Sequence, residues 1–125
     1  MMGAATPPNA LKLPPARRIR RPREFKHVYS TGRRFGNEFF TANSQRNDLT
    51  WARLGMSIAA RNLRRAVDRN RVRRLIRESF RMHQQELPAL DIIIGARTST
   101  IKADRADLRA ALEKLWQKIA ASCAT

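Results

Sequence analysis

The residues with the clearest chemistry lie between Arg61 and Arg81, in the stretch RNLRRAVDRNRVRRLIRESFR. It contains nine arginines and only two acids, Asp68 and Glu78. An arginine fork donates two parallel hydrogen bonds to a phosphate and stacks on bases, whereas lysine supplies only a point charge. A solvated basic face is the alternative interpretation, but charge this dense favours contact with the phosphates of a nucleic acid.

A helix beginning near Ala66 would divide this stretch into two faces, since each residue turns the chain by about 100°. One face would pack on a core, with Val72, Leu75, Ile76, Ser79 and Phe80. The other face would carry side chains spaced three, four, seven and eleven residues after the first, a spacing that places them on one side of a helix: Asn70, Arg73, Arg74, Arg77 and Arg81. Like charges at these spacings repel by roughly 0.2–0.5 kcal/mol per pair, so an anionic partner would stabilise the arrangement.

The side chains that a protein active site requires are not clustered in this sequence. The 10 Asp and Glu residues are scattered singly, apart from Asp104 and Asp107, which fit the start of a helix. His27 and His83 belong to different predicted helices, and Cys123 is near the end of the chain. We expect no catalytic residue and no metal site in the protein alone. His83 is expected to be partly buried or capping, and His27 could touch RNA.

Composition indicates one basic, folded domain. Lys and Arg total 26 against 10 Asp and Glu, which gives a net charge of +16, typical of nucleic-acid-binding proteins. Apolar residues make up 42% of the chain, enough for a core. A membrane-surface protein is the competing class, but the apolar helix face is better used as core, and no apolar run reaches about 18 residues.

Residues 1–16 are expected to form a disordered tail rich in proline and alanine, and residues 17–125 a single domain. The prolines at positions 7, 8, 14 and 15 interrupt any continuous apolar core of a secretory signal. A lone cysteine suits a reducing compartment. We therefore expect a cytoplasmic protein with no membrane association.

Two elements are predicted before the first turn signals. Residues 23–29 should form a short helix, with Pro22 in its first turn and Gly32 as its C-terminal cap. Phe25 and Tyr29, four residues apart, share a face of this helix. Their spacing alone favours a core role over a binding role. Residues 33–44 should be extended, with a bend at Gly36 and a strand body at 38–43.

The remaining elements follow from turn chemistry and alternation. A turn is predicted at 45–48, and a strand with one buried face at 51–58. The arginine-rich helix should end near Gln85, because Pro88 bars its continuation. Residues 90–96 then read as a central strand covered on both sides. Asp104 should begin the last helix, whose apolar face is Leu108, Leu112, Leu115, Trp116 and Ile119. Together these elements predict an α/β sandwich with a mixed sheet.

Residues 66–81, AVDRNRVRRLIRESFR, resemble the "RNR" helix of the bacterial ribonuclease P protein subunit. Residues 25–32 are similar to the family's early aromatic helix that ends in glycine. Residues 54–58 and 91–97 are similar to the strand before the signature helix and to the apolar last strand. The resemblance extends over about residues 17–120.

The resemblance implies an α-β-β-β-α-β-α two-layer sandwich, about four strands in a mixed sheet, and an unusual left-handed β-α-β crossover. In this family a large catalytic RNA removes the 5′ leader of precursor tRNA, using Mg²⁺ held mainly by the RNA. The protein would bind both RNAs and would need no protein oligomer. The positions implied to meet the catalytic RNA are Arg61, Arg65, Arg69, Asn70, Arg71, Arg73, Arg74, Arg77 and Arg81. Those implied to meet the leader are Phe25, Tyr29, Lys26 and Phe39.

Two other classes share part of this pattern. A ribosomal structural protein would carry the same charge. A DNA-binding transcription or nucleoid protein would also use a basic helix, but normally with a tight helix-turn-helix pair or a dimer seam.

Overall fold

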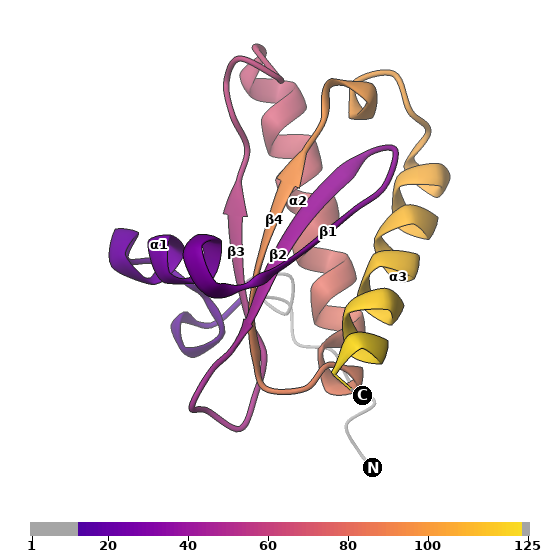
Figure 1. The fold of residues 1–125 in the computed structure, drawn as a ribbon. Coiled ribbons are helices and arrows are strands. Elements are labelled where there is room, and N and C mark those ends of the chain that lie inside the picture. Colours follow the sequence, from indigo (N-terminus) through magenta and orange to yellow (C-terminus); the bar gives the residue numbers. More distant parts are fainter. Residues whose placement is uncertain (1–12, 124–125) are drawn as a thin grey trace.

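The computed structural model describes residues 13–123, in which the chain forms three α-helices and four strands. The helices are α1 (Pro22–Thr31), α2 (Ala66–His83) and α3 (Arg105–Ser122). The strands are β1 (Arg33–Gly36), β2 (Phe40–Arg46), β3 (Arg53–Ser57) and β4 (Leu90–Ala96). Short 3-10 helices occupy Pro15–Arg17 (η1), Gln84–Glu86 (η2) and Thr98–Thr100 (η3). The predicted order α-β-β-β-α-β-α is confirmed (Figure 1).

The strands form one mixed sheet in the order β1-β2-β4-β3. Strand β2 is antiparallel to β1 and β4, whereas β3 is parallel to β4. The parallel pair is connected through α2, since adjacent parallel strands need a long crossover. Strand β4 is central and its three isoleucines are buried, as its unbroken apolar sequence predicted. The handedness of the β3-α2-β4 crossover stays a prediction.

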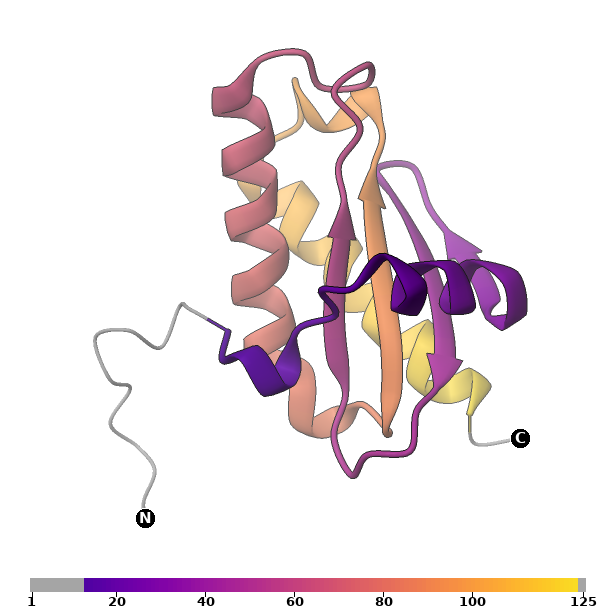
Figure 2. The ribbon, with the colours of Figure 1, turned by 90° about the vertical axis from the view of Figure 1, so that its left-hand side faces the viewer.

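Helices α2 and α3 pack on one face of the sheet, and α1 crosses the other (Figures 1 and 2). The main core lies under α2 and α3, where the rings of Phe80 and Trp116 meet edge to face at 5.8 Å. A smaller cluster of Ile19, Val28 and Ile93 lies beneath α1. Both predicted apolar helix faces are confirmed. Within residues 13–123, no helix combines the length and apolar character needed to cross a membrane.

The turn between β1 and β2 differs from the prediction of a strand body at 38–43. Strand β1 ends at Gly36, and Asn37 closes a turn because its Oδ1 accepts hydrogen bonds from the backbone N–H groups of Phe39 (3.0 Å) and Phe40 (2.9 Å). An asparagine side chain that replaces a backbone acceptor in this way favours a turn. The strand therefore starts two residues later than predicted.

The predicted turn at 45–48 was also placed too early. Gln45 and Arg46 continue β2, because they pair with Asp91 and Leu90 of β4. Local turn propensity is weak beside the hydrogen bonds of a sheet ladder, which depend on the partner strand.

The N-terminal boundary of the domain lies before residue 17. Leu13 is buried in the main core, and η1 follows it. The indole N–H of Trp51 donates a hydrogen bond of 2.7 Å to the carbonyl of Ala16. The prediction of a disordered tail was therefore wrong for residues 13–16, and for residues 1–12 it lies outside the described residues.

Two helix caps were predicted correctly in position but not in mechanism. The N–H of Gly32 closes α1 on the carbonyl of Val28 at 2.8 Å, with an ordinary negative φ of −81°. Glycine is needed there because a Cβ would lie 2.5 Å from the carbonyl oxygens of Val28 and Ser44. Asp104 is the N-cap residue of α3, but its side chain makes no capping hydrogen bond.

Candidate nucleic-acid interface

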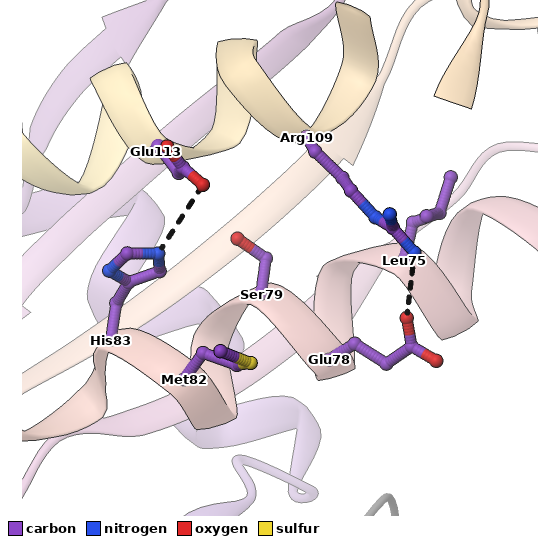
Figure 3. Close-up of a pocket in the computed structure, with 7 residues that line it drawn as sticks. All are labelled: Leu75, Glu78, Ser79, Met82, His83, Arg109 and Glu113. Carbon is purple, nitrogen blue, oxygen red and sulfur yellow. Dashed lines mark ion pairs between the residues drawn. The ribbon is translucent and has the colours of Figure 1, made fainter. Parts of the chain in front are cut away.

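One side of α2 packs against α3. The indole N–H of Trp116 donates to Ser79 Oγ at 2.8 Å, and Arg109 Nη2 lies 3.9 Å from Glu78 Oε1. His83 Nε2 lies 3.9 Å from Glu113 Oε2, and the His83 side chain is 23% exposed, which confirms the partly buried position expected for this histidine. A cavity of about 320 Å³ lies between the two helices (Figure 3), lined by Leu75, Glu78, Ser79, Met82, His83, Arg109 and Glu113. Most of the arginines of α2 lie on the part of its surface that faces away from α3 and from the core.

The predicted arginine face lies on that outer surface of α2. The side chains exposed there or on its approach are Arg61, Arg64, Arg65, Asn70 and Arg74. Arg73, Arg77 and Arg81 are half-buried along the same surface. Arg65 Nε is 3.8 Å from Asp68 Oδ2, and because the Arg65 side chain is exposed, this long ion pair contributes little to stability. The predicted cations are therefore brought together on one side of the molecule, in a form that can meet an anionic backbone.

Two predicted contact residues also hold the fold. Arg69 Nη1 donates to the carbonyls of Leu63 and Arg64, both at 2.8 Å, and so closes the loop before α2. Arg71 Nη2 donates to the carbonyl of Ala103 at 2.8 Å, which links α2 to the segment before α3. Both guanidinium groups are partly committed to backbone carbonyls. Their contact with RNA stays a prediction.

The opposite face of the sheet carries three rows of side chains under and beside α1. The pairing register places Arg53, Asp91 and Gln45 in the first row, Gly55, Ile93 and Asn43 in the second, and Ser57, Gly95 and Thr41 in the third. Helix α1 packs on the middle row, where Val28 contacts Ile93 and the Phe25 ring lies over Gly55. A Cβ on Gly55 would come within 2.9 Å of Phe25 Cζ, so glycine lets this ring lie against the sheet.

The structure separates the two aromatic residues of α1. Phe25 is half-buried against the small cluster, whereas Tyr29 is 46% exposed. The spacing-based preference for two core aromatics therefore fits Phe25 better than Tyr29. Lys26 is exposed on the same helix. Phe39 lies apart in the β1–β2 turn, where it packs on the main core and meets Phe40 edge to face at 6.5 Å.

Tyr29 lies on the side of α1 that is nearer to a sheet row of small residues. Glu24 faces the first row, because its Oε2 contacts Arg53 at 3.1 Å. Helix geometry then places Tyr29 on the opposite side of α1, toward the third row, which consists of Ser57, Gly95 and Thr41. Ser57 is exposed and Gly95 and Thr41 are partly exposed, so small side chains lie beside an exposed ring, an arrangement suited to an unpaired nucleotide.

A hollow of about 520 Å³ lies on the other flank of α1. It is lined by Arg23, Glu24, His27, Arg46, Asn47, Asp48, Leu49, Arg53 and Asp91. Arg23 and Arg46 were not predicted to face a binding surface, whereas His27 was expected to be able to touch RNA. The signal for Arg23 and His27 was their spacing of four residues on one helix, whereas Arg46 joins them only through the sheet.

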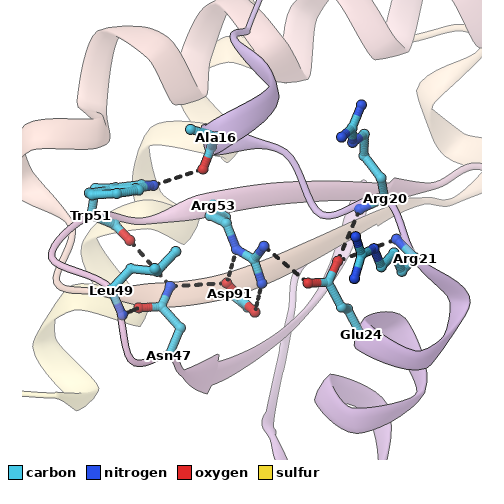
Figure 4. A network of polar contacts seen from close by, with 9 residues as sticks. All are labelled: Ala16, Arg20, Arg21, Glu24, Asn47, Leu49, Trp51, Arg53 and Asp91. Atoms are coloured by element: carbon cyan, nitrogen blue, oxygen red, sulfur yellow. Dashed lines mark hydrogen bonds and ion pairs between the residues drawn. The ribbon is translucent and has the colours of Figure 1, made fainter.

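A polar network forms the wall of this hollow (Figure 4). Arg53 binds Asp91 through Nε (2.8 Å) and Nη2 (2.7 Å), and Asn47 Nδ2 donates to Asp91 Oδ1 at 3.0 Å. Burial alone would raise the pKa of Glu24, but hydrogen bonds from the Arg21 backbone and from Arg53 outweigh it and lower that pKa. Hydrogen bonding to Asp91 in turn raises the pKa of Arg53.

The network leaves these acids unsuited to bind a metal ion. Asp91 and Glu24 both face the guanidinium of Arg53. Across the described residues, no group of three or more histidine, cysteine or acidic side chains is placed to hold a metal. The ion pairs with Arg53 therefore already occupy the carboxylates that a magnesium ion would need in this hollow.

Comparison with known proteins identifies similar chains of closely matching length and fold. The family described as Ribonuclease P matches residues 13–120. The ribonuclease P protein component of Thioalkalivibrio sulfidiphilus is 39% identical over 107 residues, which cover 86% of this chain and 89% of the relative. That of Escherichia coli K12 (DH10B) is 40% identical over 108 residues, which cover 86% and 91%.

Two solved structures have the same fold. The Staphylococcus aureus RNase P protein superposes with a TM-score of 0.76 at 32% identity, over 83% of this chain and 94% of the other. The Thermotoga maritima RNase P protein gives 0.74 at 27% identity, over 82% and 96%.

Proposed function

The chain belongs to the ribonuclease P protein family, and from this premise we propose that it is the protein component of a ribonuclease P whose catalyst is RNA. The holoenzyme would hydrolyse the phosphodiester bond that joins the 5′ leader to precursor tRNA. The protein would act by binding both RNAs and would supply no nucleophile or general base. The observation that carries this proposal is the arginine face of α2, set on a domain of this family.

The catalytic RNA would bind the outer surface of α2. Arginine forks there can neutralise phosphates bidentately, and the helix holds them on a rigid element. Exposed Arg74 and half-buried Arg73 and Arg77 offer the charge without having carbonyl ligands like those of Arg71. A folded RNA has closely spaced phosphates, which these arginines could bind.

The 5′ leader would bind the other side of the sheet, along α1. Exposed Tyr29 supplies a stacking surface, Lys26 a nearby charge, and the third sheet row a floor of small side chains. Each base–aromatic stack contributes about 1–3 kcal/mol. Phe39 is not on this helix, so its contact with the leader would require a strand that reaches the β1–β2 turn.

Magnesium would be held mainly by phosphates of the catalytic RNA. The protein would assist by concentrating RNA phosphates near its cations. The metal would activate water and stabilise the leaving oxygen.

The test is cleavage of a precursor tRNA by the purified protein, by the ribonuclease P RNA of the same organism, and by the two together. The protein alone should be inactive. The mixture should release the 5′ leader at low salt and low magnesium, where the RNA alone is slow. Metal-dependent cleavage by protein shown to be free of RNA would overturn the proposal, as would a mixture no faster than RNA alone.

A further inference from the structure

A second group of arginines lies directly before α1. Residues 17–23 read RRIRRPR, five arginines in seven positions. Within residues 13–123, none of the five guanidinium groups forms an ion pair with a carboxylate. Arg17 is stacked over the Trp51 ring at 6.0 Å, and Arg23 borders the hollow beside α1. The directions in which the side chains of Arg18 and Arg20 point can be derived from the conformation of their backbone.

The backbone of this segment lies along the outer edge of β3. Arg18 is extended and pairs with Leu54 in parallel, and the N–H of Ile19 donates to the Leu54 carbonyl at 2.9 Å. Ile19 is buried in the small cluster beneath α1. Since side chains alternate along extended chain, Arg18 and Arg20 project toward the opposite face of the sheet, where α2 lies. Figure 4 shows the Arg20 side chain directed away from the network around Glu24.

The cationic flank of α2 is found at the same edge. Helix α3 contacts β1 and β2, whereas α2 contacts β3. Because α3 occupies the flank of α2 that carries Glu78 and Ser79, the flank with Arg73 and Arg77 is turned outward beyond β3. Figure 2 shows the segment before α1 passing beside α2 at this edge. Leu13 fastens that segment into the same core that α2 covers.

We propose that Arg18 and Arg20 join Arg73 and Arg77 in one continuous phosphate-binding surface around the β3 edge, and that its ligand is the folded catalytic RNA. This inference rests on the proposed function. Because Arg18 and Arg20 directly precede α1, their position in the chain alone would suggest that they bind the leader. The direction of their side chains instead places them on the face of the sheet that α2 covers.

The chemistry of the surface agrees with a folded RNA. Trp51 lies at this edge, but its N–H is bound to the carbonyl of Ala16 and its ring is under Arg17. A single strand is held by stacking its bases on open rings, which this edge does not offer in the described structure. Guanidinium groups from two elements instead fit the paired phosphate rows of a helix.

Three charge-matched double variants test the inference. Arg18→Gln/Arg20→Gln removes the edge pair, and Arg23→Gln/Lys26→Gln removes two cations from α1. Lys114→Gln/Lys118→Gln removes two exposed cations from α3. For each, affinity for the catalytic RNA alone is measured against salt, together with the ratio of precursor to mature tRNA affinity in the reconstituted enzyme.

The edge variant should flatten the salt dependence of binding to the catalytic RNA by about 1.4–1.8 in log–log slope, the value for two phosphates that are no longer neutralised. Its precursor-to-mature ratio should match the unmodified protein. The α1 variant should lower that ratio and leave the slope unchanged. The inference is overturned if the edge variant lowers the ratio instead, or if its slope equals that of the α3 variant. If the unmodified protein does not bind the catalytic RNA, the proposed function itself fails.

Discussion

Arg53 and Asp91 face each other on adjacent parallel strands and share two hydrogen bonds, of 2.8 and 2.7 Å, although 38 residues separate them in the chain. The remaining nitrogen of the fork reaches Glu24 of α1 at 3.1 Å. One guanidinium group thus connects β3, β4 and α1. Arg53 therefore stabilises the fold and is not free to bind RNA. The proposed leader surface depends on Arg53 only because this residue holds α1 against the sheet.

Replacement of Arg53 by Met should destabilise the domain by about 3 kcal/mol, the lower end for a broken buried ion pair, because Asp91 would stay buried without its partner. The double variant Arg53→Met/Asp91→Asn should recover part of this loss. The measurement is urea unfolding of the single variants and the double variant. A loss below about 0.5 kcal/mol would mean that the pair behaves as an exposed one.

Acid should weaken the same network through Glu24. Its folded-state pKa is lowered, so its contribution to stability is present above the unfolded value of about 4.3 and is lost as the pH falls through the folded value. Melting temperatures of the unmodified protein and Glu24→Gln should therefore differ at pH 7 and converge below about pH 4. A difference that stays constant down to pH 3 would contradict this. Arg53, with a raised pKa, stays charged throughout this range.

Tyr29→Ala should weaken binding of precursor tRNA by roughly 5- to 150-fold, the equivalent of one stacked base, and leave mature tRNA unaffected. Tyr29 is exposed, so the variant should fold normally. Phe25→Leu keeps an apolar side chain on Gly55 and isolates the ring itself. Met82→Ala, which removes another exposed apolar side chain, is the control. Equal weakening of both RNAs in folded variants would show that these residues only support the core.

The triple variant Arg73→Gln/Arg74→Gln/Arg77→Gln should bind the catalytic RNA more weakly, with a salt slope reduced by about 0.7–0.9 for each phosphate that is no longer bound. Stability should be unchanged or slightly increased, because like charges on one helix repel. The control triple, Arg105→Gln/Lys114→Gln/Lys118→Gln, removes the same charge from α3. Binding is measured against salt, with circular dichroism to check folding. Unchanged affinity and slope would show that α2 is not the RNA-binding face.

The order of the elements and the two faces of α2 were predictable from the sequence, since both are local. Val72 and Ile76 recur with the helical period, and Pro88 and Gly32 mark the ends of helices. The Ile92–Ile94 run similarly indicated a strand covered on both sides.

The errors occurred where distant partners decide the outcome. Arg46 lies in a strand because Leu90 pairs with it, and Leu13 is ordered because a core is available to bury it. Neither partner is visible in a local window. The same holds for Arg69 and Arg71, whose charges predicted a binding face but whose carbonyl ligands are set by loop positions.

The sequence by itself therefore determined that this is a basic α/β protein whose arginines lie on one side of a helix, because charge and periodicity are properties of short segments. Only the tertiary structure decided on which side of the sheet each cationic side chain lies and whether it is free to bind RNA. Ile19 packs beneath α1 and turns Arg20 to the other face, whereas Arg53 is taken by Asp91. These choices depend on burial and pairing across the sheet, which bring together residues that local patterns treat as independent.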